Sequence, residues 1–209
     1  MHQPIPHNHV AIVVVTGPGA LAAAVRLHQA GVDDVVLIDH DADDVMTLHW
    51  QADRQRWLIT TASDEQTATH IVVDTDALAD RLFGTEGMSM AESWDGEPVA
   101  YLGTSVHGFP NCYLVHGPNI GLRHNSVEQM RESQADYVAA AVAYARDFGF
   151  AAVEPTPAAQ QNYANFRPRG TADFRRRITR FTPRDHLVQR PVRASAAVSA
   201  AGLPATGSC

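Results

Sequence analysis

Two short apolar runs flank an amphipathic stretch near the start of the chain. Residues 9–15 (HVAIVVV) and 35–39 (VVLID) are rich in β-branched residues, as is typical of strands buried on both faces of a parallel sheet. Between them, residues 20–30 carry apolar side chains at helical spacing, and Gly31 follows as a helix stop. The predicted apolar stripe consists of Leu21, Ala24, Val25 and Leu27. The pattern predicts a βαβ unit with a right-handed crossover.

The middle of the chain has a weaker pattern. Residues 57–61 and 70–74 are strand-like runs on either side of a polar stretch, so we expect them to pair as a hairpin. Residues 76–98 read as loop with one short helix. Residues 100–102 and 111–116 are again strand-like, the second strongly so.

Residues 125–148 carry the clearest helical pattern. Ser126 can cap the start, Gln129 three residues later completes a capping box, and Gly149 ends the run. Together with the βαβ unit, this helix predicts an α/β fold. We expect a mostly parallel sheet, a small β-hairpin or meander insertion and a long C-terminal helix.

The charges divide the chain into two parts, a domain over residues 1–165 and a tail over residues 166–209. The tail holds nine arginines and two acids, whereas the preceding part holds seven arginines and 21 acids. A basic tail can bind nucleic acid, but it can also lie on an acidic body or stay disordered. Few aromatic residues interleave the arginines, and the acidic body repels phosphates, so we expect no nucleic-acid partner. The tail should be largely irregular, and disordered from about residue 187.

The composition is that of a globular protein, with 45% hydrophobic and 19% charged residues. No apolar run reaches the roughly 18–20 residues that a membrane helix needs, and the first residues lack the pattern of a signal peptide. Cys112 and Cys209 form no disulfide framework. We therefore expect a cytoplasmic protein without membrane association.

The turn after the first strand has features of a dinucleotide site. Gly17 and Gly19 lie where the chain must turn tightly and approach a pyrophosphate. The following helix would aim its positive end at that anion. Asp39 ends the second strand, where a carboxylate can bind the ribose hydroxyls.

The same turn departs from the fingerprint at its first position. Val15 stands where the pattern requires its first glycine, while Ala20 at the last position is a tolerated replacement. Pro18 stiffens the turn and removes an N–H donor. Since many βαβ units bind no nucleotide, this turn alone leaves cofactor binding open.

A later segment carries a more specific pattern. Residues 103–126 read GTSVHGFPNCYLVHGPNIGLRHNS and lead into the long helix. This segment resembles the C-terminal FAD segment of Baeyer–Villiger-type and related flavin monooxygenases. Residues 31–45, 68–76 and 94–101 resemble further pieces of that family, although the ATG ending of the second piece is lost.

The resemblance implies a reduced, Rossmann-like FAD-binding domain. It implies that Gly17, Pro18, Gly19 and Ala20 hold the FAD pyrophosphate and that Asp39 holds the ribose. It also places Asn119 and Gly121 beside the flavin ring. The alternative is that the glycines only form tight turns and that Ser126 only caps a helix.

The resemblance also shows what this chain does not contain. No second glycine-rich βαβ unit is found, so no NADPH site is predicted, and the family's linking fingerprint is missing. Arg123 lies near the presumed flavin edge without matching a catalytic motif, so no catalytic residue is assigned. His107, His116 and His124 are irregularly spaced, and no metal site is expected. Cys112 is interpreted as strand core.

Two functions remain open. In the first, the chain is a truncated FAD-binding monooxygenase relative that oxygenates an organic substrate when a reductase partner supplies reduced flavin. In the second, it is a non-catalytic remnant that serves as a binding or oligomerising module. An incomplete sheet would expose apolar surface, so a homo-oligomer is also expected.

Overall fold

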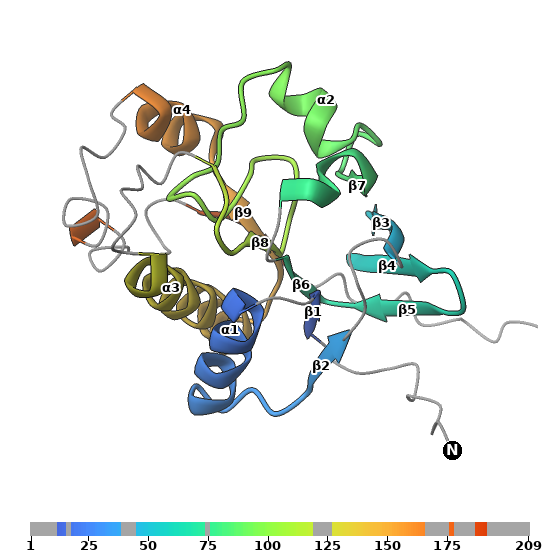
Figure 1. Ribbon diagram of the computed structural model, residues 1–209, viewed down its shortest axis with the longest axis vertical. Coiled ribbons are helices and arrows are strands. Elements are labelled where there is room, and N and C mark those ends of the chain that lie inside the picture. Colours follow the sequence, from blue (N-terminus) through green and yellow to red (C-terminus); the bar gives the residue numbers. More distant parts are fainter. Residues whose placement is uncertain are drawn as a thin grey trace, which may run out of the picture.

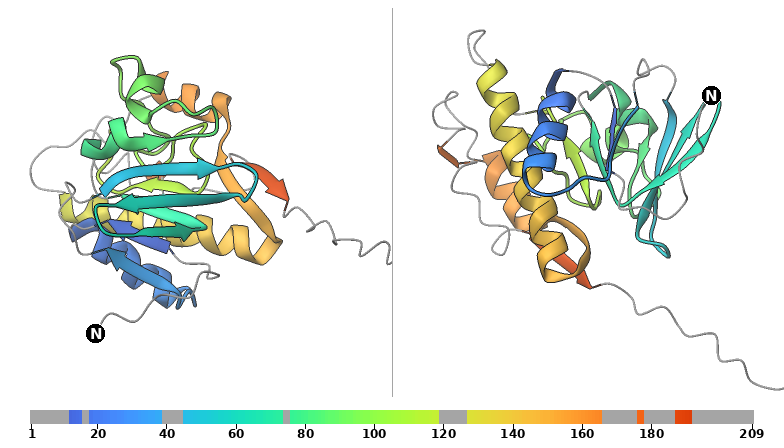
Figure 2. Two further views of the ribbon diagram at one scale, coloured as in Figure 1. Left: turned by 90° about the vertical axis from the view of Figure 1, so that its right-hand side faces the viewer. Right: turned by 90° about the horizontal axis from the view of Figure 1, so that it is seen from below.

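The computed structural model describes residues 12–15, 18–38, 45–73, 76–118, 127–165, 176–177 and 187–191. Within them the chain is a mixed α/β structure, as the sequence predicts. Figures 1 and 2 show helices α1 (Pro18–Gln29) and α3 (Val127–Phe148) on one side of a central sheet and a second sheet on the other side. The same part of the chain contains no helix that is long and apolar enough to cross a membrane.

The central sheet has the strand order β2-β1-β6-β8, and every neighbouring pair is parallel. Its strands are β1 (Ile12–Val15), β2 (Val35–Ile38), β6 (His70–Val73) and β8 (Cys112–Leu114). Helix α1 connects β1 to β2. All four residues of β6 are buried, because the helices cover one face of this strand and the second sheet covers the other.

The second sheet has the order β5-β4-β3-β7. Its strands are β3 (Val45–Gln51), β4 (Arg56–Thr61), β5 (Glu65–Ala68) and β7 (Leu82–Phe83). The predicted hairpin between residues 57–61 and 70–74 is therefore wrong: β4 pairs with β3 and β5, while β6 joins the parallel sheet. Strand β5 was missed because three of its four residues are polar.

Two core clusters lie on either side of the central sheet. Val72 of β6 packs in the cluster against the helices, whereas its neighbours Ile71 and Val73 pack in the cluster between the sheets. This alternation follows from the period of two in a strand. The central sheet is thus the layer that joins both halves of the core.

Helix α1 buries a different face from the predicted one. Ala20, Ala23 and Leu27 are buried, whereas Leu21 and Val25 are 58% and 49% exposed. Small residues face α3 because the two helices pack closely, and Arg26 forms an ion pair with Asp136 of α3 at 2.9 Å. The apolar residues are distributed around most of α1, so spacing alone did not select the buried face.

The long helix α3 lies inside the fold and is not its last element. It leads into β9 (Phe150–Pro155) and α4 (Pro157–Asn165), and β9 pairs antiparallel with β10 (Leu187–Pro191). The expectation of disorder from residue 187 is therefore wrong for β10. The division at residue 165 stays a prediction, and Ser126 lies outside the described residues.

The loop between β6 and β8 holds short elements. They are η1 (Asp76–Arg81), β7 and α2 (Met90–Trp94), and α2 begins with a capping box between Ser89 and Glu92. Residues 100–102 do not form a strand, since Leu102 and Gly103 adopt φ values of 52° and 60° in a tight turn. This turn belongs to the candidate site.

Candidate functional site

Three of the predicted cofactor residues, Pro18, Gly19 and Ala20, lie at the carboxyl edge of the central sheet. Because β1, β6 and β8 are parallel, their carboxyl ends lie at the same edge, and ligands of open α/β sheets bind there. Pro18, Gly19 and Ala20 begin α1 directly after β1, and Gly117 follows β8. Four further predicted residues lie outside the described part of the chain, namely Gly17, Asp39, Asn119 and Gly121. Arg123 lies outside it as well.

Ala20 has a packing role at this edge. Its side chain is 2% exposed and belongs to the core cluster beneath the helices. A small residue at the last position of a dinucleotide turn permits close packing of the helix on the sheet. Ala20 is therefore suited to holding the start of α1 against the sheet, and the N-terminal end of a helix is the end that favours an anion.

Two glycine turns touch at the carboxyl end of β8. A Cβ atom on Gly117 would lie 2.5 Å from the carbonyl oxygen of Gly103 and 2.9 Å from Cβ of Leu114. Only glycine fits this contact, because real Cβ atoms stay farther from backbone oxygens. The GT turn at residues 103–104 is thus packed directly against the backbone at Gly117.

A buried amide joins these two turns. Gln134 of α3 is fully buried, and its Nε2 donates hydrogen bonds to the carbonyl oxygen of Gly103 at 2.8 Å and to Oγ1 of Thr104 at 3.2 Å. Its Oε1 accepts a hydrogen bond from the backbone N–H of His116 at 2.8 Å. The long helix therefore holds the backbone on both sides of the close contact.

Sequence reasoning missed Gln134, although a signal was present. The residue lies four positions after Met130 and three before Tyr137, within the buried stripe of α3. An amide on the apolar face of a helix requires partners, because an unpaired buried amide is costly. Here the partners are the GT turn at residues 103–104 and the backbone of His116.

The GFPN segment has a structural role. Asn111 has a φ of 55°, and its Nδ2 donates to the carbonyl oxygens of Thr69 and Ala151, each at 2.9 Å. Its Oδ1 accepts from the N–H of Val153 at 2.8 Å. Asn111 thereby links the start of β6 and the start of β8 to β9, at the edge opposite the predicted cofactor site.

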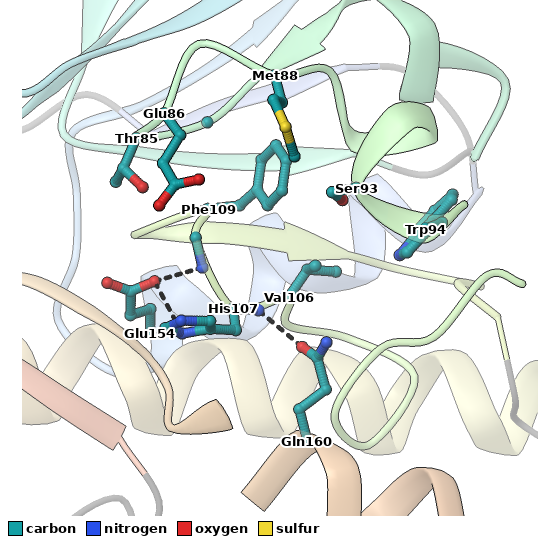
Figure 3. A pocket seen from close by; sticks show the side chains of 12 residues that line it. Thr85, Glu86, Met88, Ser93, Trp94, Val106, His107, Phe109, Glu154 and Gln160 are labelled. Atoms are coloured by element: carbon teal, nitrogen blue, oxygen red, sulfur yellow. Dashed lines mark hydrogen bonds and ion pairs between the residues drawn. The ribbon is translucent and has the colours of Figure 1, made fainter. Parts of the chain in front are cut away.

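A hollow of about 370 Å³ also lies at that opposite edge (Figure 3). Glu154 of β9, whose side chain is 1% exposed, accepts a 2.6 Å hydrogen bond from the N–H of Gly108 and lies 3.5 Å from Nδ1 of His107. That Nδ1 is also 3.0 Å from the carbonyl oxygen of Pro155. The contacts fix the loop before β8, with Trp94 and Phe109 lining the same hollow.

The remaining reactive groups of the described residues lie in the core. Cys112 is buried, and burial raises the pKa of its thiol well above the ordinary value, which favours the predicted core role over a nucleophile. No three His, Cys, Asp or Glu side chains of the described residues are grouped as a metal site. His124 lies outside this part of the chain.

Two solved monooxygenase structures are partly similar to this chain. Oxidized steroid monooxygenase bound to NADP is 24% identical, with a TM-score of 0.49, over 76% of this chain and 36% of that chain. A cyclohexanone monooxygenase mutant from Rhodococcus sp. Phi1 bound to NADP+ is 22% identical, with a TM-score of 0.47, over 76% of this chain and 35% of that chain.

Curated proteins are similar over a shorter stretch. A Baeyer–Villiger monooxygenase of Pseudomonas aeruginosa is 38% identical over 85 residues, and one of Streptomyces coelicolor is 40% identical over 90 residues. Each match covers 41% of this chain but only 16% and 17% of those proteins. No protein-family model matches the chain. The matches confirm the resemblance to Baeyer–Villiger-type flavin monooxygenases for about two fifths of the chain.

Proposed function

We propose that this chain is a FAD-binding relative of Baeyer–Villiger-type monooxygenases, built on a reduced Rossmann-like domain. The observation that carries the proposal is the contact between Gly117 and Gly103, held by the buried amide of Gln134. This close backbone contact fixes the turn at the carboxyl edge of the parallel sheet, where open α/β sheets bind their ligands.

The proposed cofactor contacts follow the edge of the sheet. Gly17, Pro18, Gly19 and the start of α1 at Ala20 would hold the pyrophosphate, and Asp39 would hold the ribose. Asn119 and Gly121 would lie along the flavin ring. FAD, when bound, would supply the redox and oxygen chemistry, while the chain would bind the cofactor, orient it and exclude water.

Reduced flavin would come from outside these 209 residues. The sequence has no second glycine-rich turn of the dinucleotide type, so we propose that a separate reductase supplies the reducing equivalents before an organic substrate is oxygenated. The substrate class of the curated relatives is not transferred, because the match covers less than a fifth of their length.

A second function is favoured by other features. Val15 replaces the first glycine of the turn, and three apolar side chains on α1 and β2 are largely exposed, namely Leu21, Val25 and Leu37. In this alternative the chain is a non-catalytic remnant that binds a partner or another copy of itself.

Matched glycine substitutions separate the two functions. Gly117→Ala should weaken FAD affinity by at least about tenfold in a fluorescence titration, because it displaces the turn beside the proposed flavin edge. Gly84→Ala is the control, since a Cβ there would lie 2.4 Å from the carbonyl oxygen of Gly108, an equal clash at the opposite edge. Equal FAD affinity of both variants, or no FAD binding by the wild type, would favour the remnant.

A further inference from the structure

A second hollow, here called the His70 hollow, lies at the edge of the central sheet opposite the proposed flavin site. Its volume is about 580 Å³. Val32 precedes β2 and His70 begins β6, so both residues mark the amino ends of parallel strands. Val142 and Ala145 of α3 and Phe150 of β9 provide apolar walls. The size and the apolar walls are those of a small-molecule site.

One polar group that lines this hollow is the imidazole of His70, whose Nδ1 has no partner among the described residues. His70 is 4% exposed, and its Nδ1 makes no hydrogen bond to any described residue. The ring stacks on Tyr113 with a centroid distance of 6.1 Å, and the buried hydroxyl of Tyr113 likewise has no partner in the described part of the chain. Buried polar atoms are nearly always hydrogen-bonded, so an unpaired nitrogen on a residue that lines a hollow points to a missing ligand atom.

The imidazole is uncharged at neutral pH. Desolvation by burial lowers the pKa of His70 from 6.5 to about 4. A neutral imidazole offers one N–H donor and one acceptor nitrogen, and the tautomer decides which atom plays which part. It can therefore accept a hydrogen bond from a hydroxyl group or donate one to a carbonyl oxygen.

The charges around the hollow balance one another. The charged lining residues are three acids and three arginines, namely Asp33, Asp34, Asp53, Arg54, Arg56 and Arg146. Nη1 of Arg146 already donates to the carbonyl oxygens of Ala30 and Gly31. A balanced rim favours neither a phosphate nor a metal ion, both of which require one dominant sign of charge.

We propose that the His70 hollow binds an uncharged small molecule with one hydroxyl or carbonyl oxygen on an apolar body, and that this oxygen hydrogen-bonds to His70. The apolar body contacts the walls formed by Val32, Val142 and Phe150, and the oxygen occupies the unpaired position of the imidazole. The site is independent of FAD, because it lies at the other edge of the sheet.

The test is a ¹⁹F NMR titration of the full chain with 4-fluorophenol, a ring with one hydroxyl, and with fluorobenzene, the same ring without it. We expect 4-fluorophenol to bind at least about tenfold more tightly, since only it completes the hydrogen bond. Equal affinity of both probes, or no binding of 4-fluorophenol, would overturn the proposal.

Three variants locate the binding. His70→Phe keeps an aromatic ring but removes the nitrogen, and should abolish the preference for 4-fluorophenol without lowering the melting temperature. Ala151→Phe, at a half-buried wall position, should reduce binding of both probes by filling the hollow. His107→Phe changes a histidine at the other hollow and should leave both affinities unchanged. If both His70→Phe and Ala151→Phe bind the two probes as tightly as the wild type does, the probes bind elsewhere and the site is refuted.

Discussion

At the scale of single residues, the buried amide of Gln134 holds the two turns of the candidate site together. It is the only described side chain that is hydrogen-bonded both to the GT turn and to the residue before Gly117. Its neighbours on the buried face of α3 are apolar, apart from Ser133, so the amide is present for its partners and not for packing alone.

Gln134→Leu should lower the free energy of unfolding by about 3 kcal/mol, because the backbone N–H of His116 and the carbonyl oxygen of Gly103 lose their partner. Urea denaturation measures this loss. Glu132→Leu, at an exposed position of the same helix, is the control and should change stability by no more than about 0.5 kcal/mol. An unchanged midpoint for Gln134→Leu would mean that the two turns hold together without it.

His70 should make stability depend on pH. Burial lowers its pKa to about 4, so the unfolded chain takes up a proton near pH 6.5 while the folded chain does not. Stability is therefore complete above pH 6.5 and falls as the pH decreases towards 4, by roughly 3 kcal/mol at most. Between these pH values, the free energy of unfolding should change less with pH for His70→Phe than for the wild type. The same pH dependence in both proteins would contradict an uncharged His70 in the folded chain.

At the scale of elements, Asn111 joins β8 to β6 and β9. Asn111→Gly keeps the positive φ but removes three hydrogen bonds, and should lower the free energy of unfolding by about 3 kcal/mol. Thermal unfolding followed by circular dichroism checks this expectation. Asn125→Gly tests another asparagine of the family-like segment. A loss of stability equal to that of Asn111→Gly would contradict the special role of the three hydrogen bonds made by Asn111.

The elements also show what the sequence could predict. The apolar runs at β6 and β8 and the long apolar stripe of α3 identified these elements, because buried strands and buried helix faces are mostly apolar. The pairing of β4 with β3 and β5 was not predictable from local pattern. The pairing depends on contacts between residues apart in the chain, and β5 (EQTA) has a composition typical of a loop.

The candidate site was predictable in part for a related reason. Gly17, Gly19 and the GPN loop are visible as motifs, since glycine and proline are local signals. Gln134 and the contact between Gly103 and Gly117 depend on residues far apart in the chain. Such contacts appear only when α3 is packed against the sheet.

At the scale of the whole molecule, exposed apolar residues suggest self-association. Leu21 and Val25 lie one turn apart on the same face of α1 and are largely exposed. Replacing both with Gln should reduce concentration-dependent association in sedimentation velocity without lowering the melting temperature. Met46→Gln is the control, because Met46 is 55% exposed on β3 in the other sheet. A wild-type protein that stays monomeric at all concentrations would contradict this expectation.

The central claim concerns the carboxyl edge of the parallel sheet, where the start of α1 and the paired turns around Gly117 lie. The most direct test is the visible absorption spectrum of the purified protein, recorded again after FAD is added and the sample is desalted. Our account predicts flavin bands that remain with the protein after desalting. A colourless protein that retains no FAD would contradict the account and leave the non-catalytic module as the function to pursue.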